Sequence, residues 1–250
     1  MAEAMARIVR PEQYAAKRAQ ILNTAQRLML SKGYECMSIQ DILEEVRISR
    51  GAFHHYFASR EALLEAFIKQ VKEESGTPLR QLIDDPKLSA REKFQGFFDT
   101  LDRLRMERKA EVVRIGRVWY SDSNAVVRLR VTEAIARQRA QLLNEIVRQG
   151  IQEGSFVAAY PDNAGEVIVT LLQGMGDRHA ELLFALDQTR DNDQHLIEEI
   201  VTTHAVYMDA IERVLGVPPH TFYRTNAEGV QLWVEAIREN NQQEDPGHAP

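Results

Sequence analysis

The residues best suited to recognition chemistry form one short run, Arg50-Gly51-Ala52-Phe53-His54-His55-Tyr56-Phe57. Phe53 and Phe57 lie one helical turn apart, so both can point into a core from the same face. The other positions then present Arg, Gly, Ala, His, His and Tyr, which donate hydrogen bonds or let a backbone approach closely. Such a face, on a helix braced by another through a short turn, suits the major groove of DNA.

Two helix-start signals position this run. Ser38-x-x-Asp41 is typical of a helix beginning at Ile39, because the serine hydroxyl accepts a backbone N–H and the aspartate complements the helix dipole. Apolar residues then recur at helical spacing up to Val46. Ile48 does not fit the helical spacing of these apolar residues, which indicates that the helix has ended. Ser49 follows as a second N-cap. We therefore expect two short helices with a tight joint between them.

The stretch from Gln40 to Leu64, with Ile-Ser-Arg-Gly-Ala-Phe-His-His-Tyr-Phe at its centre, resembles the DNA-binding domain of TetR-family transcriptional regulators. That family often reads Val-Ser-Lys-Gly-x-Leu-Tyr-His-His-Phe here, so this chain departs from it at His54 and Tyr56. The resemblance covers roughly residues 12 to 74. It implies a helix-turn-helix domain and double-stranded DNA as a partner. The DNA-binding residues that we expect are Ser38, Gln40, Ser49, Arg50, Gly51, Ala52, His54, His55, Tyr56 and Arg60. Arg50 can read guanine or clamp a phosphate; His54 and Tyr56 suit the backbone, and Ser38 and Arg60 suit flanking phosphates.

Composition and charge agree with this interpretation. Hydrophobic residues make up 44% of the 250-residue chain and charged residues 27%, with few glycines and prolines, which favours an all-α protein. The net charge is −6, yet residues 1–60 hold nine Lys/Arg and six Asp/Glu, or +3, and the remainder therefore carries −9. A basic head on an acidic body directs the phosphate backbone to one part of the molecule.

The sequence carries no catalytic or metal-binding pattern. The seven histidines lack metal-ligand spacing, and no Gly-rich phosphate loop or nucleophile motif is present. We expect no enzyme activity, no metal and no cofactor. The one cysteine, Cys36, agrees with a cytoplasmic protein, and we expect it to be a buried thiol rather than a redox sensor. No apolar run is long enough for a membrane span, and no signal core precedes the first helix.

The helical pattern predicts the following organisation. Residues 1–58 form the helix-turn-helix domain, with a frayed end before a first helix that runs from Pro11 to Ser31. A linking helix covers 59–75 and ends at Gly76-Thr77-Pro78. A helical effector-binding and dimerisation domain covers 76–240, and 241–250 form a disordered tail. Within the body we expect helices over 89–108, 110–120, 124–152, 160–186, 191–215 and 226–239.

Two long helices near the end are apolar around more than one stripe, which suits a four-helix interface between two subunits. An intrachain bundle is the alternative. The family resemblance implies the same homodimer, which matches a palindromic operator. The interface residues that we expect are Val167, Leu171, Gly174, Met175, Leu182, Ile200, Tyr207 and Ile211.

The predicted body has about six helices, which is more than the support of a DNA-binding domain requires. The family resemblance implies that a small-molecule effector binds there. Aromatic candidates for its pocket are Phe94, Phe97, Phe98, Trp119, Tyr120 and Phe184, each of which could instead fill the core. Arg103, Arg105, Arg114 and Arg117 could face an anionic effector or form a solvated basic surface. We expect a dimeric, ligand-released repressor; the alternative is an adaptor or nucleoid-associated protein that keeps the fold without an effector response.

Overall fold

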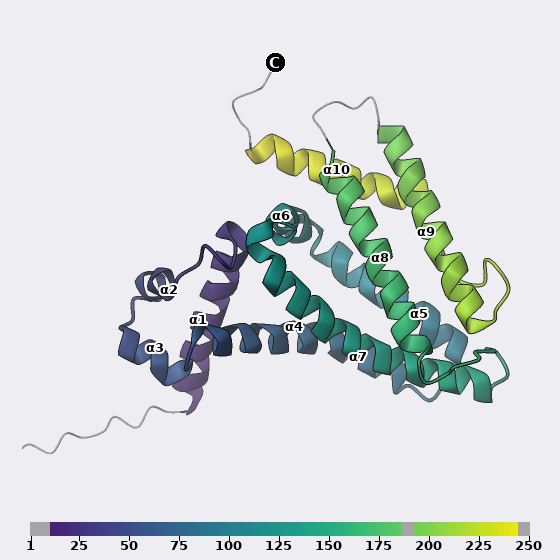
Figure 1. The fold of residues 1–250 in the computed structure, drawn as a ribbon, viewed down its shortest axis with the longest axis horizontal. Helices are drawn as coiled ribbons and strands as arrows, with labels where there is room; N and C mark the ends of the chain where they lie inside the picture. Colours follow the sequence, from purple (N-terminus) through teal and green to yellow (C-terminus); the bar gives the residue numbers. More distant parts are fainter. Residues whose placement is uncertain (1–10, 187–192, 245–250) are drawn as a thin grey trace, which may run out of the picture. The chain divides into compact units, whose positions relative to one another are not determined.

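The computed structural model describes residues 11–186 and 193–244, and every regular element in these ranges is helical. The expected all-α fold is confirmed (Figure 1). The elements in chain order are α1 (Pro11–Lys32), α2 (Ile39–Val46), α3 (Arg50–Tyr56), α4 (Arg60–Ile83), α5 (Ala90–Glu107), α6 (Lys109–Trp119), the short 3-10 helix η1 (Asp122–Asn124), α7 (Ala125–Gln152), α8 (Ala164–Phe184), α9 (Asp193–Leu215) and α10 (Ala227–Glu244).

The chain forms two compact units, which we call the head and the body. The head contains the residues up to Val71 together with Val118–Val131, and the body contains Lys72–Arg117 and the residues from Thr132 onward. The chain passes from one unit to the other three times, within α4, α6 and α7. The predicted boundary at residue 58 differs from this division, because the first turns of α4 and the segment 118–131 belong to the head.

In the head, α1 buries Ile21, Leu22, Ala25 and Met29 and ends at Gly33. Gly33 has φ +89°, and a Cβ there would lie 2.1 Å from the hydroxyl oxygen of Ser123. Only glycine fits both the left-handed backbone and this contact. The predicted end of the first helix is therefore confirmed. Its cause is the left-handed backbone at Gly33 together with the close contact of this residue with Ser123.

Asn124 joins the segment 118–131 to the rest of the head. Its side chain is 1% exposed, accepts the Tyr34 backbone N–H at 2.8 Å, and donates to the carbonyl oxygens of Met29 at 3.1 Å and Val118 at 2.9 Å. One buried carboxamide thus supplies the acceptor for the Tyr34 N–H and an additional donor to two carbonyl oxygens that also accept bonds from Gly33 and Ser121.

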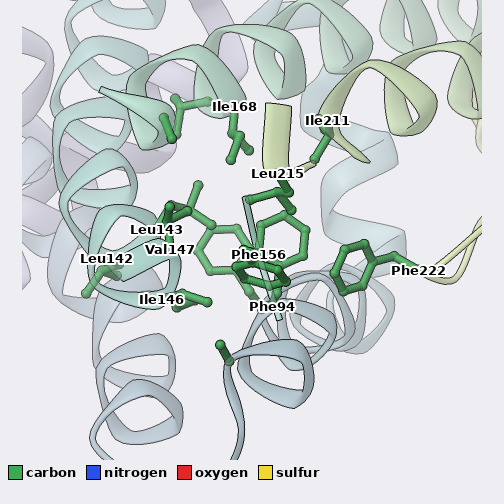
Figure 2. Packing of buried hydrophobic residues seen from close by; sticks show 14 of the residues in the cluster. Phe94, Leu142, Leu143, Ile146, Val147, Phe156, Ile168, Ile211, Leu215 and Phe222 are labelled. Carbon is green, nitrogen blue, oxygen red and sulfur yellow. The ribbon is translucent and has the colours of Figure 1, made fainter. Parts of the chain in front are cut away.

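The body has its own hydrophobic core, built from α4, α5, α7, α8, α9 and the loop after α9. Phe94 lies at its centre, with ring centroids 4.6 Å from Phe222 and 6.1 Å from Phe156 (Figure 2). Leu143, Ile146 and Val147 of α7 are fully buried against this cluster. α8 and α9 pack along one another (Figure 1).

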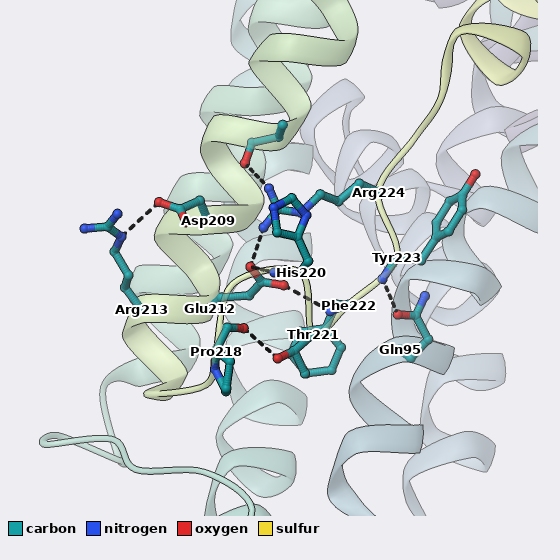
Figure 3. Close-up of polar contacts among 11 residues, drawn as sticks. Gln95, Asp209, Glu212, Arg213, Pro218, His220, Thr221, Phe222, Tyr223 and Arg224 are labelled. Atoms are coloured by element: carbon teal, nitrogen blue, oxygen red, sulfur yellow. Dashed lines mark hydrogen bonds and ion pairs between the residues drawn. The ribbon is translucent and has the colours of Figure 1, made fainter.

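The loop after α9 is held by a buried carboxylate. Glu212 is 1% exposed and accepts the backbone N–H groups of His220 and Phe222, each at 3.0 Å (Figure 3). The Arg224 guanidinium pairs with the same carboxylate and donates to the Ala205 carbonyl oxygen at 2.9 Å. These bonds fix the segment that delivers Phe222 to the core.

Three sequence expectations are corrected. α4 does not stop at Gly76-Thr77-Pro78 but continues to Ile83. Gly76 lies within the helix, where a Cβ would come within 2.1 Å of the amide nitrogen at the flexible end of the Gln138 side chain, and Thr77 donates to the Glu73 carbonyl oxygen at 2.8 Å. Burial of Leu79 and Ile83 offsets the roughly 3 kcal/mol that an internal proline costs a helix.

Cys36 is exposed rather than buried, because the neighbouring Met37 takes the buried position in the turn before α2. α10 extends to Glu244, so residues 241–244 are helical and not part of a tail. The remaining tail residues 245–250, and the frayed end predicted for residues 1–10, lie outside the described residues.

Candidate DNA-binding surface

The expected capping box at the start of α2 is present. The Asp41 N–H donates to the Ser38 hydroxyl at 3.2 Å, and the Ser38 N–H donates to the Asp41 carboxylate at 2.6 Å. Lys32 pairs with the same carboxylate at 2.7 Å. Hydrogen bonds from Lys32 and then from Ser38 hold the pKa of Asp41 well below its ordinary value. Ile42, Leu43 and Val46 are buried on the opposite side of this short helix.

The joint between α2 and α3 consists of three residues. Arg47 has a left-handed backbone (φ 54°), and its N–H and that of Ile48 both donate to the Leu43 carbonyl oxygen. Ser49 then caps α3 by accepting the Ala52 N–H at 3.2 Å. This is the geometry of a helix-turn-helix, and it was predicted from the two serine caps.

α3 divides into a buried and an exposed side as predicted. Phe53 is 0% and Phe57 2% exposed, while Arg50, Gly51, His54 and His55 lie at the surface. A Cβ added to Gly51 would meet only the Ser49 hydroxyl oxygen, at 4.0 Å. Nothing within the head therefore requires a glycine at this exposed position, so its missing side chain leaves room for a partner.

Residues of α1 support the exposed side of α3, and the sequence reasoning missed one of them. The Tyr14 ring packs against the Tyr56 ring with 4.9 Å between centroids and a tilt of 32°, and the Tyr14 hydroxyl donates to the His55 carbonyl oxygen at 3.3 Å. Arg18 lies over the Phe57 ring at 4.6 Å. Tyr14 and Arg18 are four residues apart, a spacing that places both on one face of α1. This four-residue spacing was the sequence feature from which the role of Tyr14 could have been predicted.

The remaining predicted DNA contacts have partners within the head. His54 shares a hydrogen bond with the Ala58 carbonyl oxygen at 3.1 Å, and Gln40 donates to the Glu44 carboxylate at 2.9 Å. The Arg60 guanidinium lies 3.8 Å from the Tyr34 ring centroid and donates to the Tyr34 carbonyl oxygen. Arg60 is thus half-buried and serves to position the turn before α2. Residues 40–50 also line a shallow hollow of about 390 Å³ between the two helices.

The aromatic effector candidates do not form one lining. Phe94 and Phe97 are 0% exposed within the packed body core, which is the alternative role considered for them, and Phe98 packs against that core. Phe184 belongs to a second body cluster with Trp233. Trp119 and Tyr120 belong to the head. Arg103 and Arg105 are exposed and paired with Glu107 and Asp102, Arg114 is exposed, and the side chain of Arg117 lies outside the described residues.

The predicted interface residues separate into two groups. Val167 is 46% exposed, and Leu171, Gly174, Leu182 and Tyr207 are half-buried. Met175, Ile200 and Ile211 are 8%, 3% and 0% exposed, because the body core of the same chain covers them. These three have almost no surface to offer a second copy, and their assignment to the interface was wrong. Val206 of α9, which was not among the predicted residues, is 62% exposed.

In the part of the chain that the structure describes, no group of three His, Cys, Asp or Glu side chains could hold a metal ion. No helix in the same ranges combines the length and apolar character that crossing a membrane requires.

The chain thus combines a helix-turn-helix head, in which α3 is exposed, with a helical body. The family model for bacterial regulatory proteins of the tetR family matches residues 21–67. YuxN of Bacillus subtilis (strain 168), an uncharacterized HTH-type transcriptional regulator, is 32% identical over 84 residues, which are 32% of this chain and only 29% of that protein. The HTH-type transcriptional repressor KstR2 of Mycolicibacterium smegmatis (strain ATCC 700084 / mc(2)155) is 23% identical over 149 residues, 58% of this chain and 70% of KstR2.

Among solved structures, RolR in complex with its ligand resorcinol superimposes with a TM-score of 0.51 at 21% identity, covering 91% of this chain and 96% of RolR. At this identity the likeness shows the fold. The likeness to the tetR family of bacterial regulatory proteins is thus shown for residues 21–67, within the head.

Proposed function

We propose that this protein is a transcriptional regulator that represses as a homodimer on a palindromic DNA operator and is released by a small-molecule effector. The exposed side of α3, with Phe53 and Phe57 anchored behind it, is the observation that carries the proposal. In this role Gly51 admits close approach to the duplex, and Arg50 contacts a guanine edge or a phosphate.

The homodimer would form through α8 and α9. Val167 and Val206 expose apolar surface there, and a hollow of about 500 Å³ lies along α9. Its lining includes Arg178, Thr203 and Tyr207. A two-fold dimer carries two copies of α3, and successive major grooves on one face of a duplex are about 34 Å apart. A palindromic operator follows from that symmetry.

Release by an effector would follow if the ligand favoured a dimer with the two heads wrongly spaced. KstR2 is a repressor and RolR binds resorcinol, and both precedents support a ligand-controlled repressor on this fold. The body also has a hydrophobic core of its own.

The test begins with selection of bound sites from random duplex DNA by the purified full chain, followed by gel-shift titration and sedimentation. We expect a palindromic consensus bound by a dimer. Arg50→Ala should weaken operator binding by about 1–3 kcal/mol while the dimer persists. Arg137→Ala, at an 80% exposed arginine of the body, is the matched control and should leave binding unchanged.

Binding that depends steeply on salt but selects no sequence would replace this proposal by the nucleoid-associated alternative. Failure to bind any duplex at low ionic strength would reject both.

A further inference from the structure

The short helix α3 needs a contact that fixes its rotation. It has seven residues, about two turns, which is too short for a helix to be stable by itself. Its buried anchors, Phe53 and Phe57, lie one turn apart on one line along the helix. Two anchors on one line allow the helix to roll about that line, and a roll would change which side chains meet a duplex. A contact away from the line is therefore required.

Tyr14 of α1 supplies such a contact. Its hydroxyl donates to the His55 carbonyl oxygen at 3.3 Å, and the last carbonyl groups of a helix have no partner within the helix. Its ring centroid lies 4.9 Å from that of Tyr56 and 5.5 Å from that of His55, with 88° between the planes of the Tyr14 and His55 rings. The centroids of the His55 and Tyr56 rings lie 5.3 Å apart. These three side chains, which we call the aromatic triplet, join α1 to the C-terminal end of α3.

The aromatic triplet holds the His55 imidazole on the side of α3 that faces away from the core. His55 is exposed and lies about 160° around the helix axis from both Phe53 and Phe57. Within residues 11–186 and 193–244, no hydrogen bond engages a ring nitrogen of His55. The neighbouring His54 differs, because one of its ring nitrogens shares a hydrogen bond with the Ala58 carbonyl oxygen. His55 is thus the histidine that offers both ring nitrogens to a partner.

The surroundings of His55 leave room for a base edge. Gly51 lies four residues earlier on the same face of α3, and a Cβ there would meet only the Ser49 hydroxyl oxygen, at 4.0 Å. The absent side chain leaves open space beside the imidazole. An imidazole has at least one N–H to donate in each of its protonation states. In the major groove, N7 is the acceptor that guanine and adenine share.

We propose that His55 donates a hydrogen bond to N7 of an operator purine, and that Tyr14 is the positioning residue that holds His55 and the rotation of α3 for this contact. The inference rests on the proposed function, because it requires binding to a specific DNA sequence. It assigns recognition of a base to a residue other than Arg50. It also makes sequence selectivity depend on a residue of α1 that acts through contacts within the head.

Selection of bound sites from random duplex DNA tests the proposal when it is carried out with the full chain and its variants. His55→Ala should remove the base preference at one base pair of each half-site, and Tyr14→Leu should weaken the preference at that same base pair. Tyr14→Phe, which keeps the ring but loses the hydroxyl, should weaken it less. The double variant of His55→Ala and Tyr14→Leu should lose no more selectivity there than His55→Ala alone. Asn23→Ala, on the opposite side of α1, is the matched control and should select the wild-type consensus.

A chemical change in the DNA tests the contact with the unaltered protein. A 7-deaza purine at the identified base pair removes the N7 acceptor and keeps base pairing. Gel shifts should show that this change lowers the operator affinity of the wild type by roughly 3- to 10-fold, as expected for one hydrogen bond, and leaves that of His55→Ala unchanged. Affinity for non-specific duplex, and its salt dependence, should be the same for the wild type and Tyr14→Leu, because Tyr14 carries no charge to neutralise a phosphate.

An unchanged consensus for His55→Ala, or a wild type that does not respond to the 7-deaza purine, overturns the role of His55. Affinity that falls equally for every sequence in Tyr14→Leu, or selectivity that stays complete, overturns the role of Tyr14. Urea unfolding checks that each variant is folded, and Tyr14→Phe gives the same comparison if Tyr14→Leu does not fold. A palindromic consensus that neither residue influences rejects this inference alone, whereas a wild type that selects no sequence rejects the proposed function and this inference with it.

Discussion

The side-chain amide of Asn124 donates to the carbonyl oxygen of Met29, 95 residues earlier in the chain, and the same side chain serves Tyr34 and Val118. Through this residue the end of α1, the turn before α2 and the start of α7 form one unit. The stability of the helix-turn-helix thus depends on a segment well outside it.

Asn124→Ala should therefore destabilise the head by about 2–4 kcal/mol, because the Tyr34 N–H loses its acceptor and three hydrogen bonds of a buried side chain are lost together. Urea unfolding followed by Trp119 fluorescence in a Trp233→Phe background isolates the head, since Trp233 belongs to the body. Asn23→Ala, at an exposed asparagine of α1 in the head, should not destabilise it. Equal effects of the two substitutions would contradict the role of Asn124.

Gly51→Ala should separate folding from recognition. The added methyl group meets open space within the head, and alanine favours a helix over glycine by up to about 1 kcal/mol, so the head should be as stable as before or more so. Operator affinity should fall, because the methyl group would occupy the space left for the duplex. Gel shifts and urea unfolding on one preparation measure both quantities, and unaltered affinity would remove Gly51 from the contact surface.

The stability of the body should decrease as the pH falls from about 6.5 to about 4 because of His204. Burial, then the charges of His179, Arg224 and Arg105, lower its pKa to about 4, so the unfolded chain binds a proton in this range that the folded chain does not. The stabilisation is complete above the unfolded pKa and is lost on the way down to the folded one. His204→Phe should reduce this pH dependence by on the order of 2 kcal/mol. Unfolding of the two proteins, compared from pH 7 to pH 4, gives the difference; parallel curves would exclude His204 as its source.

Removing either partner of the Glu212–Arg224 pair should destabilise the body more than removing both. Glu212→Leu leaves a buried guanidinium and two backbone N–H groups without their acceptor, and the expected cost is about 3–5 kcal/mol. The double variant Glu212→Leu/Arg224→Met should recover part of that loss, which a double-mutant cycle by urea unfolding measures. An exposed pair such as Arg213–Asp209 serves as the control and should show coupling below about 1 kcal/mol. Simple additivity at Glu212 and Arg224 would show that the two do not act together.

The local features of the head could be predicted from the sequence because their causes are local. The caps at Ser38 and Ser49 and the buried pair Phe53 and Phe57 follow from residues at most four positions apart. The end of α4 could not be predicted in this way, since the packing of Leu79 and Ile83 overrides the helix-breaking signal at Pro78. Burial also decides which apolar residues of α8 and α9 remain available to another chain. Ile211 and Val206 both belong to the apolar pattern of α9 in the sequence. In the structure the body core buries Ile211, whereas Val206 is exposed.

The head is discontinuous in sequence, so it cannot be excised or grafted as a single N-terminal segment. A fragment cut after Val71 keeps every residue matched by the family model but loses the buried side chains of Asn124, Val127 and Val131. A chimera that grafts this recognition helix onto another body should therefore transplant residues 118–131 along with the first 71, as two pieces of one donor.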